Sequence, residues 1–91
     1  MNATNSLARA AQLHASGNLL SARREAEAAL ATDPANVNAL RFVGVLYCQS
    51  GDAAGGAEFL RKALAEDPAD DGTRVNLLQA LLDSGQLDEV E

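Results

Sequence analysis

The sequence is poor in cysteine and aromatic residues: its 91 residues include one cysteine, no tryptophan, one tyrosine and two phenylalanines. One cysteine cannot form an intrachain disulfide, so a disulfide-stabilised fold is excluded. The N-terminal stretch lacks the basic segment and apolar core of a secretory signal. No apolar run reaches the length of a transmembrane helix. These absences predict a cytoplasmic chain with no membrane partner.

Positive charge is also scarce. Seven Lys and Arg residues stand against thirteen Asp and Glu residues, which gives a formal net charge of −6. No basic run is longer than the pairs Arg23-Arg24 and Arg61-Lys62. Because nucleic-acid binding draws much of its affinity from basic side chains on phosphates, this balance argues against a nucleic-acid partner.

Alanine, by contrast, occupies 19 positions. It is the best helix former, but its small side chain buries little apolar surface. The composition therefore predicts a mostly helical, closely packed protein of modest stability.

The dipeptide Ser-Gly recurs at residues 16–17, 50–51 and 84–85, an interval of 34 residues both times. When residues 3–36 are laid over residues 37–70, eight positions are identical, and most of them lie at two kinds of turn. A fixed period of this length is typical of stacked supersecondary units.

Each unit divides into two helices, because its apolar residues twice follow the three-and-four spacing of one helical face. Glycine can adopt the left-handed conformation that ends a helix, Asn and Asp can cap the next helix, and proline disfavours a helical residue before it. The residues in these roles are Gly17, Gly51 and Gly85, then Asn18, Asn36, Asp52 and Asp70, and finally Pro34 and Pro68. The sequence predicts helices at 4–15, 19–32, 37–49, 53–66 and 71–83.

This pattern resembles the tetratricopeptide repeat (TPR) family, whose 34-residue unit has small residues, a turn glycine and a late proline at set places. The second unit fits best, with Leu40, Val43, Gly44, Tyr47, Gly51, Leu60, Ala63 and Pro68 at matching positions. The third unit departs from the pattern at Leu78, where a small residue is usual. The resemblance implies an all-α fold, an α-solenoid of antiparallel helix pairs in one domain spanning 1–91. Its units are 3–36, 37–70 and a truncated 71–91, which makes five helices plus a stub.

Neither histidine nor cysteine chemistry is supported by the spacing. His14 and Cys48 are 34 residues apart, so they are equivalent positions on successive first helices. Packed helices lie about 8–10 Å apart, whereas a catalytic dyad needs hydrogen-bond contact near 3 Å. The pair Gly55-Gly56 lies within a helical stripe with no preceding strand, which indicates helix packing and not a phosphate-binding loop. We therefore expect no catalytic residue, no metal site and no cofactor.

The resemblance implies instead that the first helix of each unit lines a concave groove that receives a peptide or a partner helix. The predicted groove residues are Leu7, Ala11, His14, Asn38, Arg41, Val45, Cys48, Asn76 and Gln79. Positions matching those that clamp the C-terminal carboxylate of heat-shock chaperones carry no positive charge here, so that ligand is not supported. A more apolar partner fits better, with Arg41 and Asn38 fixing its register, although some apolar groove residues could simply pack into the wall.

The last predicted helix is unusually apolar for the end of a repeat array, where a polar outer surface is expected. Its leucines cover more than one face. Leu77 and Leu81 lie on one side of the helix, and Leu78 and Leu82 lie about 100° further around the helix axis. The segment 87–91 resembles the start of a further helix. Two explanations remain open: the chain is a fragment, or it associates with itself over this surface as a homodimer or larger oligomer, with helix exchange as one form.

Together these features predict a non-catalytic protein–protein interaction module that binds a peptide or partner helix in its groove and self-associates through its C-terminal helix. The alternative is an N-terminal accessory segment of a larger enzyme such as a glycosyltransferase or sulfotransferase, which is an association at the level of the fold.

Overall fold

The protein is an array of five helices, seen in a computed structural model that describes residues 3–85, with side chains from Asn5 onward. The helices are α1 (Ala3–Ala15), α2 (Leu19–Thr32), α3 (Val37–Gln49), α4 (Ala53–Glu66) and α5 (Asp71–Ser84). They agree with the predicted ranges to within one residue at every boundary. The predicted stub at 87–91 lies outside the described residues. No helix within residues 3–85 is long and apolar enough to cross a membrane.

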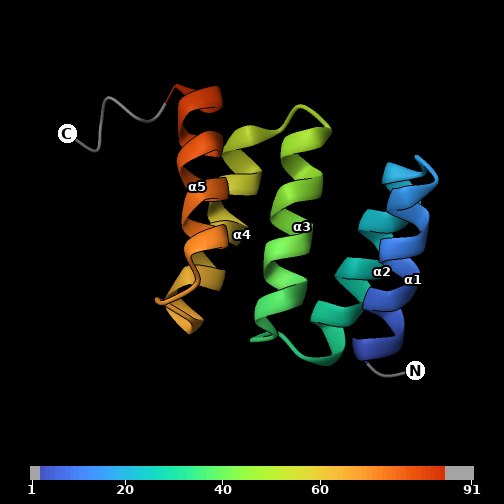
Figure 1. Ribbon diagram of the computed structural model, residues 1–91. Coiled ribbons are helices and arrows are strands. Elements are labelled where there is room, and N and C mark those ends of the chain that lie inside the picture. Colours follow the sequence, from blue (N-terminus) through green and yellow to red (C-terminus); the bar gives the residue numbers. More distant parts are fainter. Residues whose placement is uncertain (1–2, 86–91) are drawn as a thin grey trace.

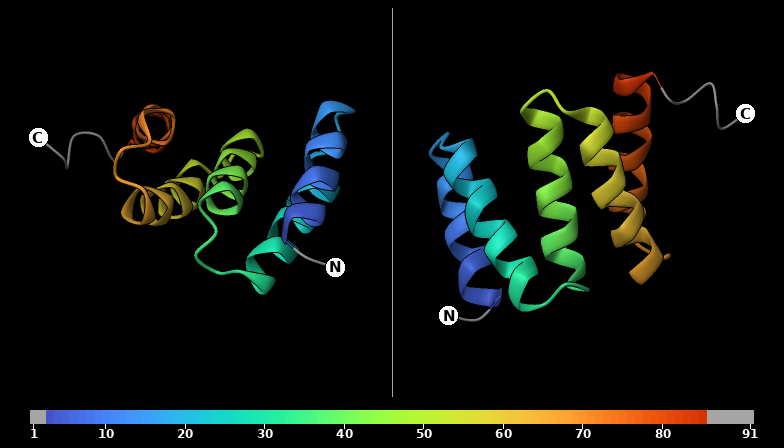
Figure 2. Two further views of the ribbon diagram at one scale, coloured as in Figure 1. Left: turned by 60° about the horizontal axis from the view of Figure 1, so that its bottom comes forward. Right: turned by 180° about the vertical axis from the view of Figure 1, so that it is seen from behind.

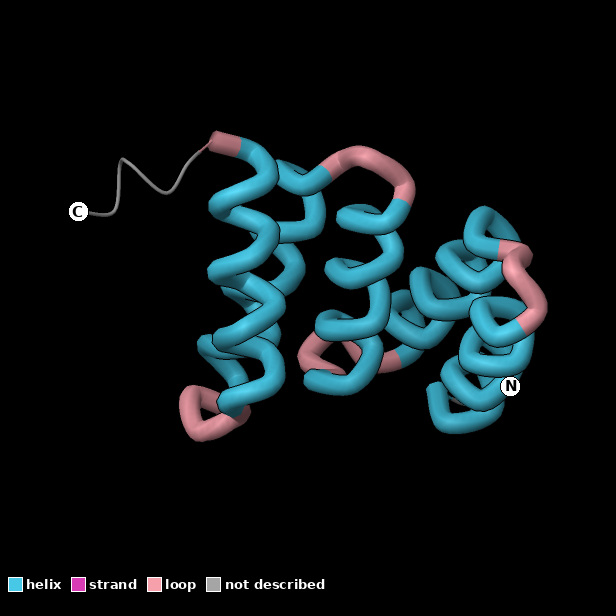
Figure 3. Tube along the Cα trace, turned by 45° about the horizontal axis from the view of Figure 1, so that its top comes forward, coloured by secondary structure: helices cyan, strands magenta, loops and turns pink. Residues whose placement is uncertain are grey.

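The helices form two layers. In Figure 1, α1, α3 and α5 lie toward the viewer, with α2 and α4 behind them, and the reverse view in Figure 2 shows α2 and α4 in front. Each helix packs along its neighbours in sequence, whereas α1 and α5 touch α3 only lightly. Short turns join successive helices (Figure 3). The arrangement confirms the predicted all-α solenoid of antiparallel helices.

The turns form largely by the predicted chemistry. Gly17, Gly51 and Gly85 all have positive φ, at 85°, 92° and 76°, a conformation that side chains disfavour. Asp52 accepts a hydrogen bond at 2.9 Å from the backbone nitrogen of Gly55 and so caps α4. Asn36 and Asp70 cap α3 and α5 in the same way, through the backbone nitrogens of Ala39 and Thr73.

The predicted cap at Asn18 is wrong. Within the described residues, the Asn18 side chain makes no capping bond to α2. Its backbone angles, φ −85° and ψ 71°, are close to those of Asp52, φ −106° and ψ 72°, which does cap α4, so they do not account for the missing bond. The first backbone donors of α2 therefore lack the side-chain acceptor that their counterparts in α3, α4 and α5 have.

Two glycines bring α3 and α4 into close contact, which confirms the packing role predicted for Gly56. A Cβ atom at Gly56 would lie 2.6 Å from the carbonyl oxygen of Gly44, and one at Gly44 would lie 3.0 Å from the carbonyl oxygen of Gly56. Both residues are buried, and Leu60 covers the crossing with a side chain that is fully buried. The two helix backbones approach so closely here that neither position has room for a side chain.

Behind α3 lies a stack of aromatic and basic side chains that joins three helices. The guanidinium of Arg23 on α2 lies 4.7 Å from the ring centre of Tyr47 on α3. The Tyr47 ring lies 5.1 Å from the ring of Phe59 on α4, over which the amine of Lys62 lies at 5.4 Å. The Tyr47 hydroxyl donates a hydrogen bond at 3.1 Å to Glu27 of α2. Such contacts stabilise by roughly 0.5–1.5 kcal/mol each, so this stack links the first helix pair to the second.

The apolar face of α5 is divided between the core and the surface. Leu81 is only 5% exposed and packs with Ala57, Leu60 and Ala80, and Leu77 is half-buried against the same cluster. Leu78 and Leu82, by contrast, are 51% and 57% exposed, and Val75, which lies on the same side of the helix, is 63% exposed. Of the four leucines predicted to lie at a self-association surface, Leu81 is therefore unavailable in the single chain and Leu77 only partly available. Val75, Leu78 and Leu82 form what we call the α5 stripe.

Candidate functional site

A hollow of about 560 Å³ opens between α1 and α3, on the face formed by α1, α3 and α5. We call it the first hollow. Its lining residues are Leu7, Ala8 and His14 of α1, Asn36, Asn38, Arg41, Phe42 and Val45 at and along α3, and Asn76 of α5. The hollow exists because α1 touches α3 only lightly, so the two helices diverge and leave one side of α3 open. Its size lies within the usual range for ligand sites.

A second hollow of about 260 Å³ continues along the same face between α3 and α5. Its lining residues are Val45, Cys48, Gln49, Leu60, Asn76, Gln79, Ala80 and Asp83. Val45 and Asn76 line both hollows, so the two adjoin. Together they make one elongated depression across α1, α3 and α5.

Eight of the nine predicted groove residues line one or both hollows. The exception is Ala11, which is exposed on α1 but lines neither hollow. Seven further residues line the hollows and are not among the nine: Ala8, Asn36, Phe42, Gln49, Leu60, Ala80 and Asp83. Asn36 could have been found, because a capping residue at the start of a first helix lies beside the groove. Leu60 and Ala80 carry no such signal, because both are core residues whose edges reach the second hollow.

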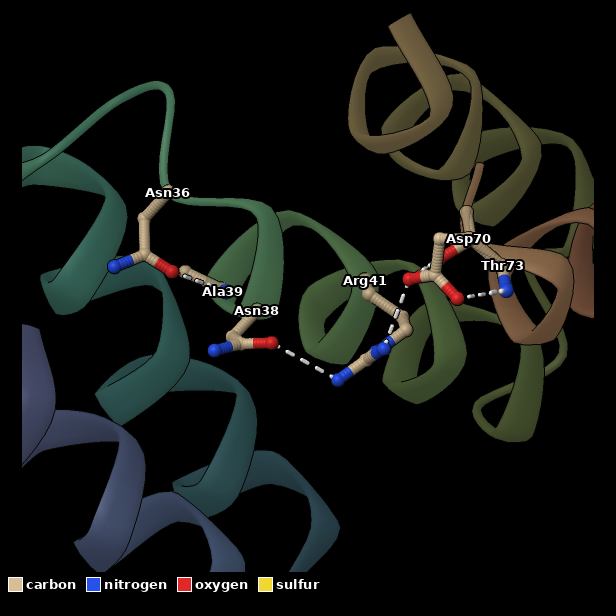
Figure 4. A network of polar contacts seen from close by, with 6 residues as sticks. All are labelled: Asn36, Asn38, Ala39, Arg41, Asp70 and Thr73. Carbon is tan, nitrogen blue, oxygen red and sulfur yellow. Dashed lines mark hydrogen bonds and ion pairs between the residues drawn. The ribbon is translucent and has the colours of Figure 1, made fainter. Parts of the chain in front are cut away.

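Arg41 is the one Lys or Arg residue lining the hollows, and it is already paired (Figure 4). Its Nη1 lies 3.0 Å from Oδ2 of Asp70, and its Nη2 donates to Oδ1 of Asn38 at 3.0 Å. Asp70 also accepts hydrogen bonds from the hydroxyl of Thr73 at 2.7 Å and from the backbone nitrogen of that residue. The bonds from Thr73 lower the pKa of the Asp70 carboxyl, and Arg41 lowers it further. The predicted register-setting pair Arg41–Asn38 is thus tied to the cap of α5.

His14 of α1 also lines the first hollow and links α1 to α3. Its Nε2 forms a hydrogen bond of 2.9 Å with Oε1 of Gln49, and its ring meets the ring of Phe42 edge-on at 5.8 Å. Cys48 lies against α4 and α5 instead, packed with the cluster around Leu60. The two residues thus have separate surroundings.

The hollows contain one thiol, that of Cys48. Burial raises the pKa of the Cys48 thiol, and the negative charges of Asp83 and Asp52 raise it further. The thiol is therefore protonated near neutral pH, which is the unreactive form. Among residues 3–85 no group of three or more His, Cys, Asp or Glu side chains could hold a metal ion. The remaining lining offers amides, the paired guanidinium of Arg41, the imidazole of His14, the carboxylate of Asp83 and apolar side chains.

The fold and the repeat have counterparts among known proteins. A family model described as tetratricopeptide repeat matches residues 47–91. The chain belongs to the tetratricopeptide repeat family. Among solved structures, a mutant of the O-GlcNAc transferase of Thermobaculum terrenum matches with a TM-score of 0.89 and 31% sequence identity. The match covers 96% of this chain but only 17% of the transferase chain. None of the curated proteins matches the chain closely enough to count as a relative.

In a tetratricopeptide array, α1, α3 and α5 are the first helices of successive units. Repeats of this family generally mediate protein–protein interactions. The first and second hollows lie on the face formed by these first helices.

Proposed function

We propose that this chain is a non-catalytic interaction module that binds a segment of another protein in the depression formed by the two hollows. The observation that carries the proposal is that residues from all three first helices line adjoining hollows, with apolar and polar side chains in both. An extended peptide or a partner helix can cross α1, α3 and α5 in one direction and contact all of them. The proposed site residues are those predicted from the sequence, without Ala11.

Blocking the first hollow tests this function. Ala8 and Ala11 are both exposed on α1, but only Ala8 lines the hollow. Ala8→Trp should fill the hollow without disturbing the core, and Ala11→Trp is the matched control on the same helix. Proteins captured from a cell extract by the wild type and by Ala11→Trp should be lost with Ala8→Trp. Capture of the same proteins by all three would contradict groove binding.

The chain also self-associates, on this proposal, through the α5 stripe. Its three side chains are each more than half exposed and lie side by side on one helix, and such contiguous apolar surface usually marks an interface. Sedimentation velocity should detect a homodimer that becomes monomeric in the variant Leu78→Glu/Leu82→Glu. Leu20→Glu is the control, because Leu20 on α2 is also 57% exposed but lies away from the stripe. A wild-type monomer across a wide concentration range would reject self-association.

Catalysis by this chain is not part of the proposed function. The thiol of Cys48 has a raised pKa. His14 forms its hydrogen bond with the side-chain amide of Gln49 and not with a nucleophile. A hydrolase and transferase activity screen of the isolated chain should therefore be negative. Turnover that is lost with Cys48→Ala or with His14→Ala would contradict this.

A second candidate function is that of an accessory segment in a larger enzyme. It is favoured by the similarity to the O-GlcNAc transferase, of which the matched region is only 17%. The native reading frame decides between the two: a continuation past Glu91 into a glycosyltransferase domain supports the accessory role. A stop codon after Glu91 would leave the independent module.

A further inference from the structure

The polar side of the first hollow presents hydrogen-bond donors in a fixed orientation. Because a guanidinium can only donate, the atom of Asn38 that faces Arg41 is its carbonyl oxygen. The amide nitrogen of Asn38 is therefore turned away from Arg41, toward the side on which α1 and α2 lie (Figure 4). Among residues 3–85 no acceptor is bonded to this nitrogen, and Asn38 is exposed and lines the hollow. Asn38 thus offers two N–H donors to a ligand.

The position of Arg41 makes a negatively charged ligand unfavourable. Its charge is balanced by Asp70 at 3.0 Å, and Asp70 is held there by Thr73 and by its role as the cap of α5. A ligand carboxylate would have to displace Asp70 or bind beside it. The second hollow adds Asp83, and the whole chain carries a net charge of −6. The surface therefore repels carboxylates and attracts basic groups.

Three large apolar side chains line the first hollow. They are Leu7, Phe42 and Val45, and each is half-buried, so each keeps part of its surface open to a ligand. At about 560 Å³ the hollow has room for a large aliphatic or aromatic side chain together with its backbone. Burying such a side chain stabilises a complex. A ligand that displaces water from the Asn38 amide must also supply a hydrogen-bond acceptor for its N–H groups.

From these three observations we infer that the first hollow binds an uncharged or basic peptide segment by an apolar side chain and a main-chain carbonyl oxygen, with the Asn38 amide donating to that oxygen. The inference rests on the proposed groove-binding function and deepens it by naming the chemistry of the partner. Arg41 is a positioning residue in this scheme, because it fixes the Asn38 amide and does not itself bind the ligand.

The test uses the full ¹⁵N-labelled chain and three blocked peptides of equal length, each with one central leucine between glycine and serine residues. The first peptide is neutral, the second has two serines replaced by lysine, and the third has them replaced by aspartate. Chemical-shift titration should move the Asn38 side-chain amide and the backbone amides lining the first hollow. The neutral and basic peptides should bind at least about tenfold more tightly than the acidic one. Equal or tighter binding of the acidic peptide would overturn the inference.

Asn38→Asp isolates the donor, because the new carboxylate keeps the partner of Arg41 and is favourable in the first turn of α3. The thermal midpoint of this variant should not fall, but the neutral peptide should bind about tenfold more weakly. Gln12→Glu makes the same change of charge on exposed α1, outside both hollows, and should leave binding unchanged. Unaltered binding to Asn38→Asp, or an equal loss in Gln12→Glu, would reject the role of Asn38 while groove binding stands. If none of the peptides shifts the hollow residues, groove binding and the inference both fail.

Discussion

Replacing Gly56 by alanine should destabilise the protein, although alanine is the better helix former. Helix propensity alone favours Gly56→Ala by about 1 kcal/mol. The new Cβ, however, would lie 2.6 Å from the carbonyl oxygen of Gly44 and would overlap the sulfur of Cys48. A carbon needs about 3.3 Å from an oxygen, so α3 and α4 would have to separate by about 0.7 Å at the crossing. Overpacking of this kind costs about 1–3 kcal/mol.

The net loss should be about 1 kcal/mol, enough to lower the thermal midpoint by about 4–8 °C in a domain of this size. Circular dichroism melting and urea titration measure it. Gly72→Ala is the matched control: Gly72 is exposed in the first turn of α5, and its Cβ would meet only Oδ1 of Asp70, at 3.4 Å. This control should gain about 0.4–1 kcal/mol.

The double variant Gly56→Ala/Cys48→Ala separates the two clashes. The stability lost through Gly56→Ala should be smaller when the change is made in Cys48→Ala than in the wild type, because the sulfur that the new Cβ would overlap is gone. The two sites are in contact, so their effects on stability are not additive. If Gly56→Ala raised the midpoint as much as Gly72→Ala, the close approach of α3 and α4 would not be limiting and the reasoning would be refuted.

Three further outcomes are expected. Tyr47→Phe removes the hydrogen bond to Glu27 and should lower the free energy of unfolding by about 0.5–1.5 kcal/mol, measured by urea titration; no change would show that the bond contributes nothing. Because the pKa of Asp70 is below its unfolded value of 3.8, the stability it contributes is present above that pH and is lost as pH falls through the folded pKa. Thr73→Val should weaken this acid dependence, and titrations at several pH values that parallel the wild type would contradict it. Cys48, whose pKa is raised, should react with iodoacetamide at pH 8 more slowly than glutathione does; an equal rate would contradict its burial.

The helices could be predicted from the sequence because their boundaries are set by local chemistry. A glycine that must adopt positive φ and a proline that cannot continue a helix act within a few residues, so Gly51 and Pro68 mark boundaries without knowledge of the fold. The face of α3 that lines the hollows is expected from the resemblance to the tetratricopeptide repeat, which implies a groove along the first helices. Asn18 shows the limit of this reasoning: its residue type permits a cap and its backbone angles resemble those of the capping residue Asp52, yet its side chain makes no capping bond.

The pairing of Arg41 could not be predicted, because it joins residues 29 positions apart. It depends on how α5 sits against α3, which no local pattern encodes. The same holds for the leucines of α5. Their spacing shows that they occupy two faces, but only the packing against α4 decides that Leu81 is buried and Leu78 is exposed. The chemistry of the site therefore depends on tertiary contacts even where the positions of its residues do not.

The stack of Arg23, Tyr47 and Phe59 has a mechanical consequence. Tyr47 and Asn38 are nine residues apart on α3, which puts them on opposite sides of that helix. The cation–π and ring contacts of the stack thus lie behind α3, whereas in front of it α1 and α3 diverge around the first hollow. A change at Tyr47 should therefore alter the angle between the first helix pair and α3, and with it the width of the first hollow, although Tyr47 does not line that hollow.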